Sequence, residues 1–162
     1  MGRFFEKISF EQFKKDICDD KNAYDNLKLP TRSTKHSAGY DFKAVYDFVI
    51  HPGEVMKVPT GVKVSMEPDE VFMIFVRSSM GVKHGVRMAN SVGIIDSDYY
   101  NNDNNEGHMY ITLKNESDKD YIVQKNEGFG QGIFTKFLMV DREEEITSDR
   151  KGGFGSTNQE EK

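Results

Sequence analysis

Short apolar stretches separated by turn sequences cover most of the chain between residues 39 and 141. Pro52-Gly53 and Thr60-Gly61 are typical turns, because proline fixes φ and glycine accepts a positive φ. Between such turns the pattern predicts strands at residues 44–50, 55–58, 62–66, 71–76, 109–113, 121–124 and 133–139. Many short strands with regular turns predict an all-β sandwich or barrel.

The N-terminal segment has a different pattern. Residues 3–17 predict a strand followed by a short helix, in which Ser9 and Gln12 have the spacing of a capping box. Phe10 and Phe13 share one face at helical spacing. We therefore expect a docking helix that covers part of the sheet.

The C-terminal segment is charged at residues 141–145 and rich in glycine and polar residues at 149–157. A chain of 162 residues is usually one domain. We expect a single β domain over residues 1–149, with its N-terminal strand and helix, and a flexible C-terminal arm over residues 150–162.

Composition narrows the class of protein. The hydrophobic fraction is 36%, and the net charge of −5 argues against general nucleic-acid binding. A single cysteine excludes an intrachain disulfide. We find neither a signal peptide nor an apolar run long enough to span a membrane. A cytoplasmic protein without nucleic-acid or membrane partners is therefore the expectation.

Two carboxylates and a tyrosine directly follow an apolar strand that begins at Gly93. At strand spacing Asp96 and Asp98 point the same way, whereas a tight turn before Tyr99 would separate their roles. Taken alone, this segment favours an ordinary hairpin turn, in which aspartate is common.

Two further segments combine cationic side chains with hydroxyls or glycines. Arg77-Ser78-Ser79 follows an apolar strand and can hold phosphate oxygens, although a polar strand cap has the same pattern. Arg150 and Lys151 begin the glycine-rich segment 150–157, whose backbone can approach an anion closely. Phe154 is suited to stack on a base. A flexible linker, the alternative interpretation, has no use for a large aromatic residue.

Several familiar sites are absent from the sequence. We find no Walker A loop, no Rossmann glycine loop before a helix and no nucleophile elbow. The one cysteine and the four histidines do not have zinc-ligand spacing.

Five segments, taken together and in order, resemble the conserved motifs of the trimeric dUTPase family. They are residues 37–41, 77–81, 90–99, 131–134 and 150–157. The resemblance implies a distorted jelly-roll β-barrel, a homotrimer and three active sites built from all subunits. It also implies Mg²⁺-dependent hydrolysis of dUTP to dUMP and pyrophosphate, which keeps dUTP low and supplies dUMP for thymidylate synthesis.

The resemblance also implies roles for single residues. Asp96 would be the general base that activates the water attacking the α-phosphate. Tyr99 would pack under the deoxyribose and leave no room for a 2′-hydroxyl. Asp41 would orient a water of the Mg²⁺ shell, with the ion held mainly by the triphosphate.

The remaining motif residues would bind the substrate. The uracil edge would be read by the hairpin 90–110, including Asn90, Gly93, Ile95 and Tyr110. Phosphate oxygens would contact Arg77, Ser78, Ser79 and Gln131. The arm would close over the phosphates with Arg150, Gly155, Ser156 and Thr157, and would place Phe154 on the uracil.

The chain departs from the family pattern in three places. Residues 101–106 are an Asn-rich insertion, which we expect to be a solvated loop tip that loops tolerate easily. Glu127 to Gly130 replace the basic residue that often precedes the glutamine of the fourth motif. Residues 1–25 extend beyond the simplest family members, and we expect them to support the subunit or the trimer surface.

Two alternatives stay open at this point. A dCTP deaminase shares the fold but needs a catalytic glutamate, and the segment 90–99 contains none. A non-catalytic dUTP-binding regulatory protein is expected to lose the base or the arm, whereas this chain keeps Asp96 and Phe154.

Overall fold

The computed structural model describes residues 2–150 and 152–153. Its helices are α1 (Phe10–Asp16), α2 (Lys21–Asp25), α3 (Ser78–His84) and the 3-10 turn η1 (Ser97–Tyr99). Its strands are β1 (Phe4–Lys7), β2 (Thr31–Arg32), β3 (Tyr40–Lys43), β4 (Phe48–Ile50), β5 (Val55–Pro59), β6 (Val62–Ser65), β7 (Glu70–Phe75), β8 (Val86–Met88), β9 (Gly93–Asp96), β10 (Tyr110–Asn115), β11 (Tyr121–Val123) and β12 (Gly128–Lys136).

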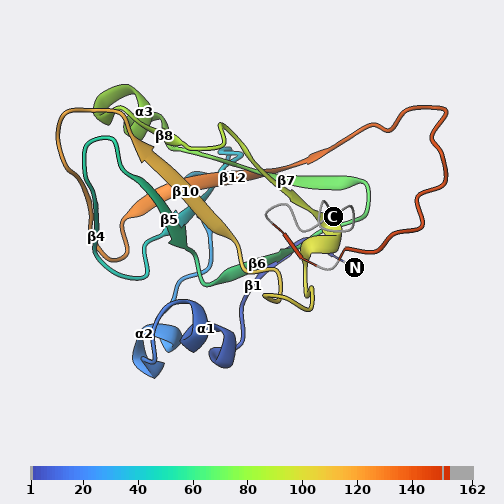
Figure 1. Ribbon diagram of the computed structural model, residues 1–162, viewed down its shortest axis with the longest axis horizontal. Coiled ribbons are helices and arrows are strands. Elements are labelled where there is room, and N and C mark those ends of the chain that lie inside the picture. Colours follow the sequence, from blue (N-terminus) through green and yellow to red (C-terminus); the bar gives the residue numbers. More distant parts are fainter. Residues whose placement is uncertain (1, 151, 154–162) are drawn as a thin grey trace, which may run out of the picture.

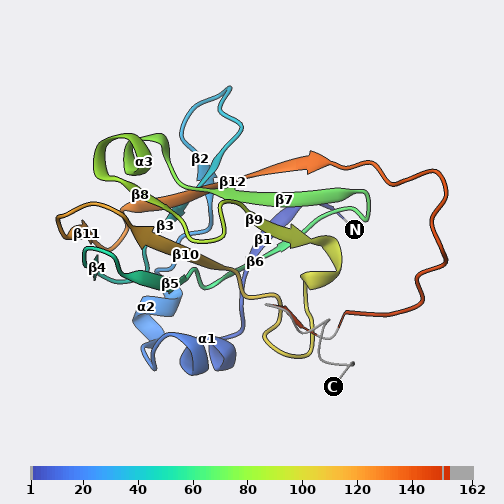
Figure 2. The same ribbon diagram turned by 45° about the horizontal axis from the view of Figure 1, so that its top comes forward.

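These strands form two main layers. The larger sheet has the order β2-β3-β12-β7-β9, and the second has the order β5-β10-β8. The pairs β1-β6 and β11-β4 complete the barrel, and the pairing is antiparallel throughout the described residues. Figures 1 and 2 show β7 and β12 on one side and β5 and β10 on the other, with α1 and α2 beside the second layer. The prediction of an all-β jelly-roll architecture is confirmed.

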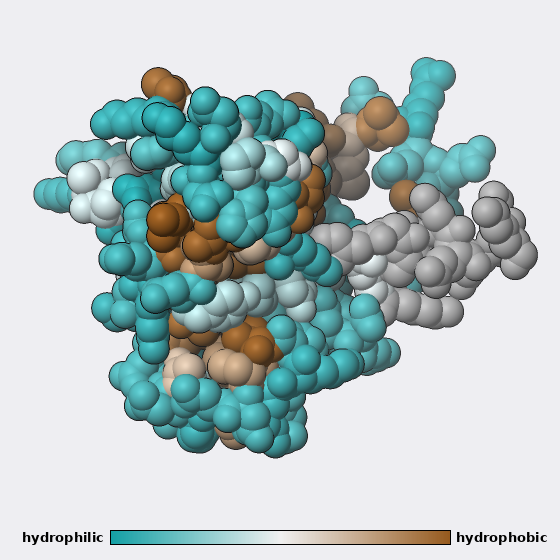
Figure 3. Space-filling view, turned by 60° about the vertical axis from the view of Figure 1, so that its left-hand side comes forward, coloured by the Kyte–Doolittle hydropathy of each residue, from teal (hydrophilic) through white to brown (hydrophobic). Residues whose placement is uncertain are grey.

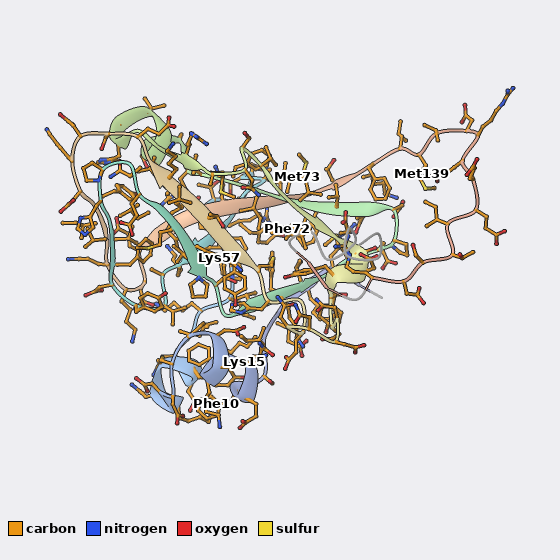
Figure 4. The ribbon with its side chains drawn as sticks, viewed as in Figure 1. Phe10, Lys15, Lys57, Phe72, Met73 and Met139 are labelled. Atoms are coloured by element: carbon orange, nitrogen blue, oxygen red, sulfur yellow. The ribbon has the colours of Figure 1, made fainter. Side chains whose placement is uncertain are left out.

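The core lies between the layers because the strands alternate. In β7 and β10 every second residue is buried. Phe72 and Ile74 of β7 share one fully buried cluster with Ile111 and Leu113 of β10. Figure 4 shows Phe72 in the interior among other side chains. Each such side chain contributes about 1.5–3 kcal/mol through its burial, so the core fixes the register of the strands that carry the site.

The N-terminal strand and helix were predicted correctly. β1 pairs with β6, and the Ser9 hydroxyl accepts a hydrogen bond from the Gln12 backbone N–H at 3.1 Å, capping α1. Phe13 is fully buried in a second apolar cluster, against which Phe10 packs. The helix therefore covers part of the barrel, as expected.

Short elements account for the errors of the sequence prediction, which missed α2, α3, β2, β3 and β8. The last strand was also misplaced: β12 begins at Gly128 and ends at Lys136, not at 133–139. Glycine there serves packing rather than turning. A Cβ at Gly132 would lie 2.2 Å from Cζ of Phe72, and one at Gly130 would lie 2.6 Å from Cδ1 of Ile111.

The chain leaves the barrel after β12 and returns. Residues 137–149 form an extended connecting segment that runs out from the sheets and back to η1, where the C-terminal arm begins (Figures 1 and 2). Leu138 is 97% exposed, and Figure 4 shows Met139 on this connecting segment, clear of the sheets.

The surface of the barrel is mostly polar. On the face shown in Figure 3, apolar side chains gather only in small patches between polar ones. None of the helices in the described part of the chain has the length and the hydropathy needed to cross a membrane.

Candidate active site

A cavity of about 310 Å³ opens between β7, β9, η1 and the start of β10. It is lined by Ile74, Asn90, Val92, Gly93, Ile94, Ile95, Asp96, Tyr99, Met109, Tyr110, Arg150 and Gly153. Seven of the residues implied by the motif resemblance meet here: Asn90, Gly93, Ile95, Asp96, Tyr99, Tyr110 and Arg150. The floor is apolar, and the mouth carries charged groups.

The pairing of β9 with β7 sets the depth of this cavity. Gly93 lies opposite Ile74, and a Cβ at Gly93 would approach Cβ of Ile74 to 3.0 Å. A side chain at this position would press against Ile74, which would have to shift by a few tenths of an ångström. Asp96 lies opposite Val71 at the other end of the pairing, with its side chain about half exposed (48%).

The turn η1 separates the directions of Tyr99 and the carboxylates. Tyr99 points inward and is 5% exposed, and its hydroxyl donates to the His108 carbonyl at 3.0 Å. Burial raises the pKa of Tyr99, so the hydroxyl keeps its proton. Asp96 and Asp98 point outward, and both bind Arg150. Both carboxylates thus belong to one ionic cluster at the mouth.

Arg150 closes this mouth from the arm. One guanidinium nitrogen contacts Oδ2 of Asp96, and Nε donates to Oδ1 of Asp98 at 2.6 Å. Three residues further, Gly153 lies against the tyrosine ring, since a Cβ there would be 2.7 Å from Cε2 of Tyr99. The end of the described arm therefore covers the cavity.

The hairpin behind the cavity is held by a buried polar network. The Nδ1 atom of His108 lies 2.7 Å from Asp16 of α1, and Nε2 accepts the Gly61 N–H at 2.9 Å. Burial lowers the pKa of His108, against the opposing pull of the Asp16 carboxylate. Burial raises the pKa of Tyr110, as does its hydrogen bond with Asp16. The neutral histidine thus joins α1 to the hairpin, with Nδ1–H as donor.

The Asn-rich insertion is folded. Its tip residues Asp103 and Asn104 are exposed, as expected of a solvated tip, but the rest of the loop packs against the protein. Asn102 is 8% exposed, and its side chain donates to the Tyr99 carbonyl at 2.7 Å. Asn101 accepts a hydrogen bond from Lys63 at 2.7 Å, and Glu106 caps the backbone N–H of Ser9 at 2.9 Å. The insertion packs because its asparagines replace water at buried backbone groups.

A second cluster of predicted residues lies at the opposite end of β7. Gln131 of β12 pairs with Asp41 of β3 and with Phe75 of β7. Nε of Arg77 lies 3.3 Å from the buried Asp41 carboxylate. The Gln131 amide donates to the Val76 carbonyl at 3.3 Å.

The start of α3 completes this phosphate-binding candidate. Ser78 and Ser79 are exposed in its first turn, directly after Arg77. A Cβ at Gly128 would lie 2.6 Å from Nη1 of Arg77, so this glycine makes room for the guanidinium. This role was not predictable from the sequence, because a glycine beside Glu127 is typical of a turn.

The two clusters are far apart within one chain. Asp96 pairs with Val71 near the start of β7, whereas Arg77 follows its end. Six residues of extended strand span about 20 Å. One copy of the chain therefore does not bring Asp96 and Arg77 together.

Four predicted site residues, Phe154, Gly155, Ser156 and Thr157, lie outside the described residues. Sequence reasoning missed the apolar floor, formed by Ile74 and Met109, because core residues look alike in a sequence. It also missed Asn105, which donates to the Tyr99 hydroxyl at 2.8 Å. Its position in a run of asparagines hid it.

Comparison with known proteins connects this geometry to one family. The sequence model of the dUTPase family matches residues 25–158. The chain is 46% identical over 138 residues to a deoxyuridine 5'-triphosphate nucleotidohydrolase of Lactococcus lactis, with 85% of this chain and 91% of the relative covered.

Solved structures agree with this match. The crystal structure of a dUTPase from Streptococcus mutans has a TM-score of 0.71 and 42% identity, and covers 88% of this chain and 100% of its own. A mutant dUTPase from phage phi11 of S. aureus, described with a structural Mg(II) ion, has a TM-score of 0.65 at 18% identity, and covers 91% of this chain and 100% of its own. The second likeness concerns the fold alone.

Proposed function

The chain belongs to the dUTPase family and hydrolyses dUTP to dUMP, and on this premise we propose that each active site combines residues of different copies in a homotrimer. The distance of about 20 Å between Asp96 and Arg77 carries the proposal. A general base acts within hydrogen-bond reach of its proton, and a cation stabilises the transferred phosphate only by contacting it. The cavity of one copy beside the Arg77 cluster of another satisfies both requirements.

The exposed connecting segment 137–149 supports association between copies of the chain. Leu138, Met139 and Val140 are 97%, 71% and 69% exposed on one chain. Contiguous apolar side chains in water are typical of contact surfaces. In a closed ring of identical copies each connecting segment meets the same surface of its neighbour. One kind of shared site is therefore repeated around the symmetry axis.

At the cavity, Asp96 is the proposed general base. It accepts a proton from the water whose oxygen bonds to the α-phosphorus, while the bond to the bridging oxygen breaks and pyrophosphate leaves. Its half-exposed carboxylate at the cavity mouth is accessible to such a water. Tyr99 lines the same cavity, and we assign its ring to the deoxyribose, which joins the phosphates to the base.

The apolar floor is suited to the uracil ring. Asn90 and the backbone of the hairpin offer fixed donors and acceptors to its edge. A cytosine would leave some of these groups unpaired, which is how a polar site rejects the wrong base. Gly93, Ile95 and Tyr110 line the same cavity, and we assign them to this contact.

Arg150 has to change partners during turnover. In the described state it forms ion pairs with both Asp96 and Asp98. Arg150 occupies a carboxylate oxygen of Asp96, so it moves to the triphosphate before that oxygen accepts a proton from the water. The arm 150–162, with Phe154, Gly155, Ser156 and Thr157 beyond the described part of the chain, then closes over the substrate as a segment distinct from the domain 1–149.

Arg77, Ser78, Ser79 and Gln131 are assigned to the phosphate oxygens. Asp41 fits Mg²⁺ bound through water, because it is a carboxylate beside the phosphate-binding side chains. Among the described residues there is no group of three His, Cys, Asp or Glu side chains that could hold a metal ion. We assign the ion mainly to the triphosphate, because Mg²⁺ keeps several waters and binds substrate phosphates. When bound, Mg²⁺ supplies charge neutralisation on the phosphate oxygens.

We place this activity in the cytoplasm, where it would keep dUTP low and supply dUMP for thymidylate synthesis. Pyrophosphate release is to be measured for dUTP, dCTP, dTTP and UTP with Mg²⁺. We expect release from dUTP, little from the others, and almost none for Asp96→Asn, which still binds dUTP. Ammonia release from dCTP would identify a deaminase, and full activity of Asp96→Asn would exclude the general base.

Mixed oligomers test the shared site. Asp96→Asn and Arg77→Ala proteins are each expected to be inactive, whereas a one-to-one mixture refolded together regains about one quarter of wild-type activity, since about that share of sites receives both intact residues from different copies. Arg87→Ala, an exposed arginine paired with Glu116, is the matched control and stays active. A mixture as inactive as its components contradicts a site shared between copies.

A further inference from the structure

The inserted loop 101–106 ends against the tyrosine that lines the cavity. Asn105 donates through Nδ2 to the Tyr99 hydroxyl at 2.8 Å, and that hydroxyl donates to the His108 carbonyl at 3.0 Å. The hydroxyl is therefore held from two sides. The ring is buried, and these two hydrogen bonds oppose its movement away from the cavity.

Asn105 is itself held in a single orientation. Its Oδ1 accepts hydrogen bonds from Asn102 Nδ2 at 2.9 Å and from the Gly107 N–H at 3.1 Å. The amide therefore presents its NH₂ group to the tyrosine and its oxygen to the loop. Asn102 in turn donates to the Tyr99 carbonyl, so the loop hydrogen-bonds both the backbone and the hydroxyl of Tyr99.

The loop is also fixed from behind. The Glu106 carboxylate accepts the Ser9 N–H at 2.9 Å and the Ser9 hydroxyl at 2.5 Å. Lys63, only 10% exposed, binds Asn101 at 2.7 Å and lies 3.6 Å from Glu106. Hydrogen bonds to charged groups are the strong ones. The insertion is thus a rigid support between the N-terminal segment and the cavity wall.

We propose that Asn105 is a positioning residue that sets the discrimination between deoxyribose and ribose by locking Tyr99 against the sugar. The proposal rests on the proposed function, in which the sugar lies on Tyr99. A 2′-hydroxyl needs space that the ring occupies. Rejection of that small group therefore depends on how far the ring can yield, and the Asn105 hydrogen bond limits this movement.

The test compares kcat/KM for dUTP and UTP by pyrophosphate release. A lost neutral hydrogen bond corresponds to about a three- to tenfold change. We expect Asn105→Ala to raise the UTP/dUTP ratio by that factor through a lower KM for UTP, and to leave the dCTP/dUTP ratio unchanged. Asn104→Ala is the matched control, because Asn104 is exposed in the same loop.

A double-mutant cycle separates this route from general loosening. Tyr99→Phe removes the hydroxyl and leaves the loop intact, so it should raise the UTP/dUTP ratio as Asn105→Ala does. The double variant should add nothing further. Three results would each overturn the proposal: equal losses for every nucleotide, fully additive effects of the two substitutions, and an unchanged UTP/dUTP ratio in Tyr99→Phe. The last result can be obtained even if Asn105→Ala does not fold. Wild-type protein without dUTP hydrolysis overturns the proposed function as well, so the two failures are distinguishable.

Discussion

Acidification is expected to destabilise the folded protein through His108, whose ring is fully buried. Its Nε2 accepts the Gly61 N–H, an arrangement that requires a neutral ring. Burial lowers the pKa of His108 below the ordinary 6.5. Below that pH His108 binds a proton in the unfolded chain but stays neutral in the folded protein. The stability contributed by the neutral histidine is therefore complete above pH 6.5 and is lost as the pH falls.

The structure bounds the size of this effect. If His108 stays neutral in the folded protein, lowering the pH from about 7.5 to about 5.5 reduces the free energy of unfolding by at most about 1.4 kcal/mol. Asp16 does not contribute in this range: burial opposes its ionisation, but hydrogen bonds from Gln12, His108 and Tyr110 outweigh it and lower its pKa below 3.8. Its stabilisation is lost only in stronger acid.

Urea unfolding at the two pH values, at one ionic strength and one protein concentration, measures the loss. His108→Gln is the control, because its amide oxygen can accept the Gly61 N–H and does not titrate. The exposed histidines His36, His51 and His84 are common to both proteins, so their contributions cancel. We expect a smaller pH-dependent loss in the variant by about 1.4 kcal/mol at most. Equal losses in both proteins would refute the reasoning.

Two further predictions concern the phosphate side of the site. A Cβ at Gly39 would lie 2.4 Å from Oε1 of Gln131, the far end of a flexible side chain, so Gly39→Ala should fold normally by circular dichroism but raise KM for dUTP about tenfold. A normal KM would remove Gln131 from the phosphate contacts. Deletion of residues 150–162 should lower kcat/KM by about a hundredfold or more with little change in Tm, because the proposed lid acts on the bound substrate and not on the core. An unchanged rate would refute the lid role, and a large drop in Tm would show that the arm is structural.

The alternation of apolar and polar residues predicted the strands in which every second side chain packs into the core. β7 and β10 have buried residues at every second position, and both were located from the sequence. α3 was missed because Gly81 and Val82 are poor helix formers. Its end is set by Gly85 at a φ of 64°, and Met80 anchors it in the core. These are tertiary reasons, which a local pattern does not carry.

The candidate site was predictable to the extent that its motifs are contiguous. Asp96, Tyr99 and Arg150 were identified from their segments, and the structure brings them to one cavity. The separation of Asp96 from Arg77 was not visible, since it depends on which end of β7 each one joins. Asn105 was indistinguishable from its exposed neighbour Asn104, because only the folded loop gives the two side chains different partners.

The helix α1 connects these observations. It has seven residues, too few to be stable alone in water. Its N-cap Ser9 binds Glu106, and its last residue Asp16 binds His108, so both ends are fixed to the hairpin that carries Tyr99. The same contacts hold the hairpin in place, and the helix and the hairpin therefore stabilise each other. Loss of either anchor should loosen the cavity wall at Tyr99 before it opens the barrel, because Phe72 and Ile111 of the main core contribute to neither anchor.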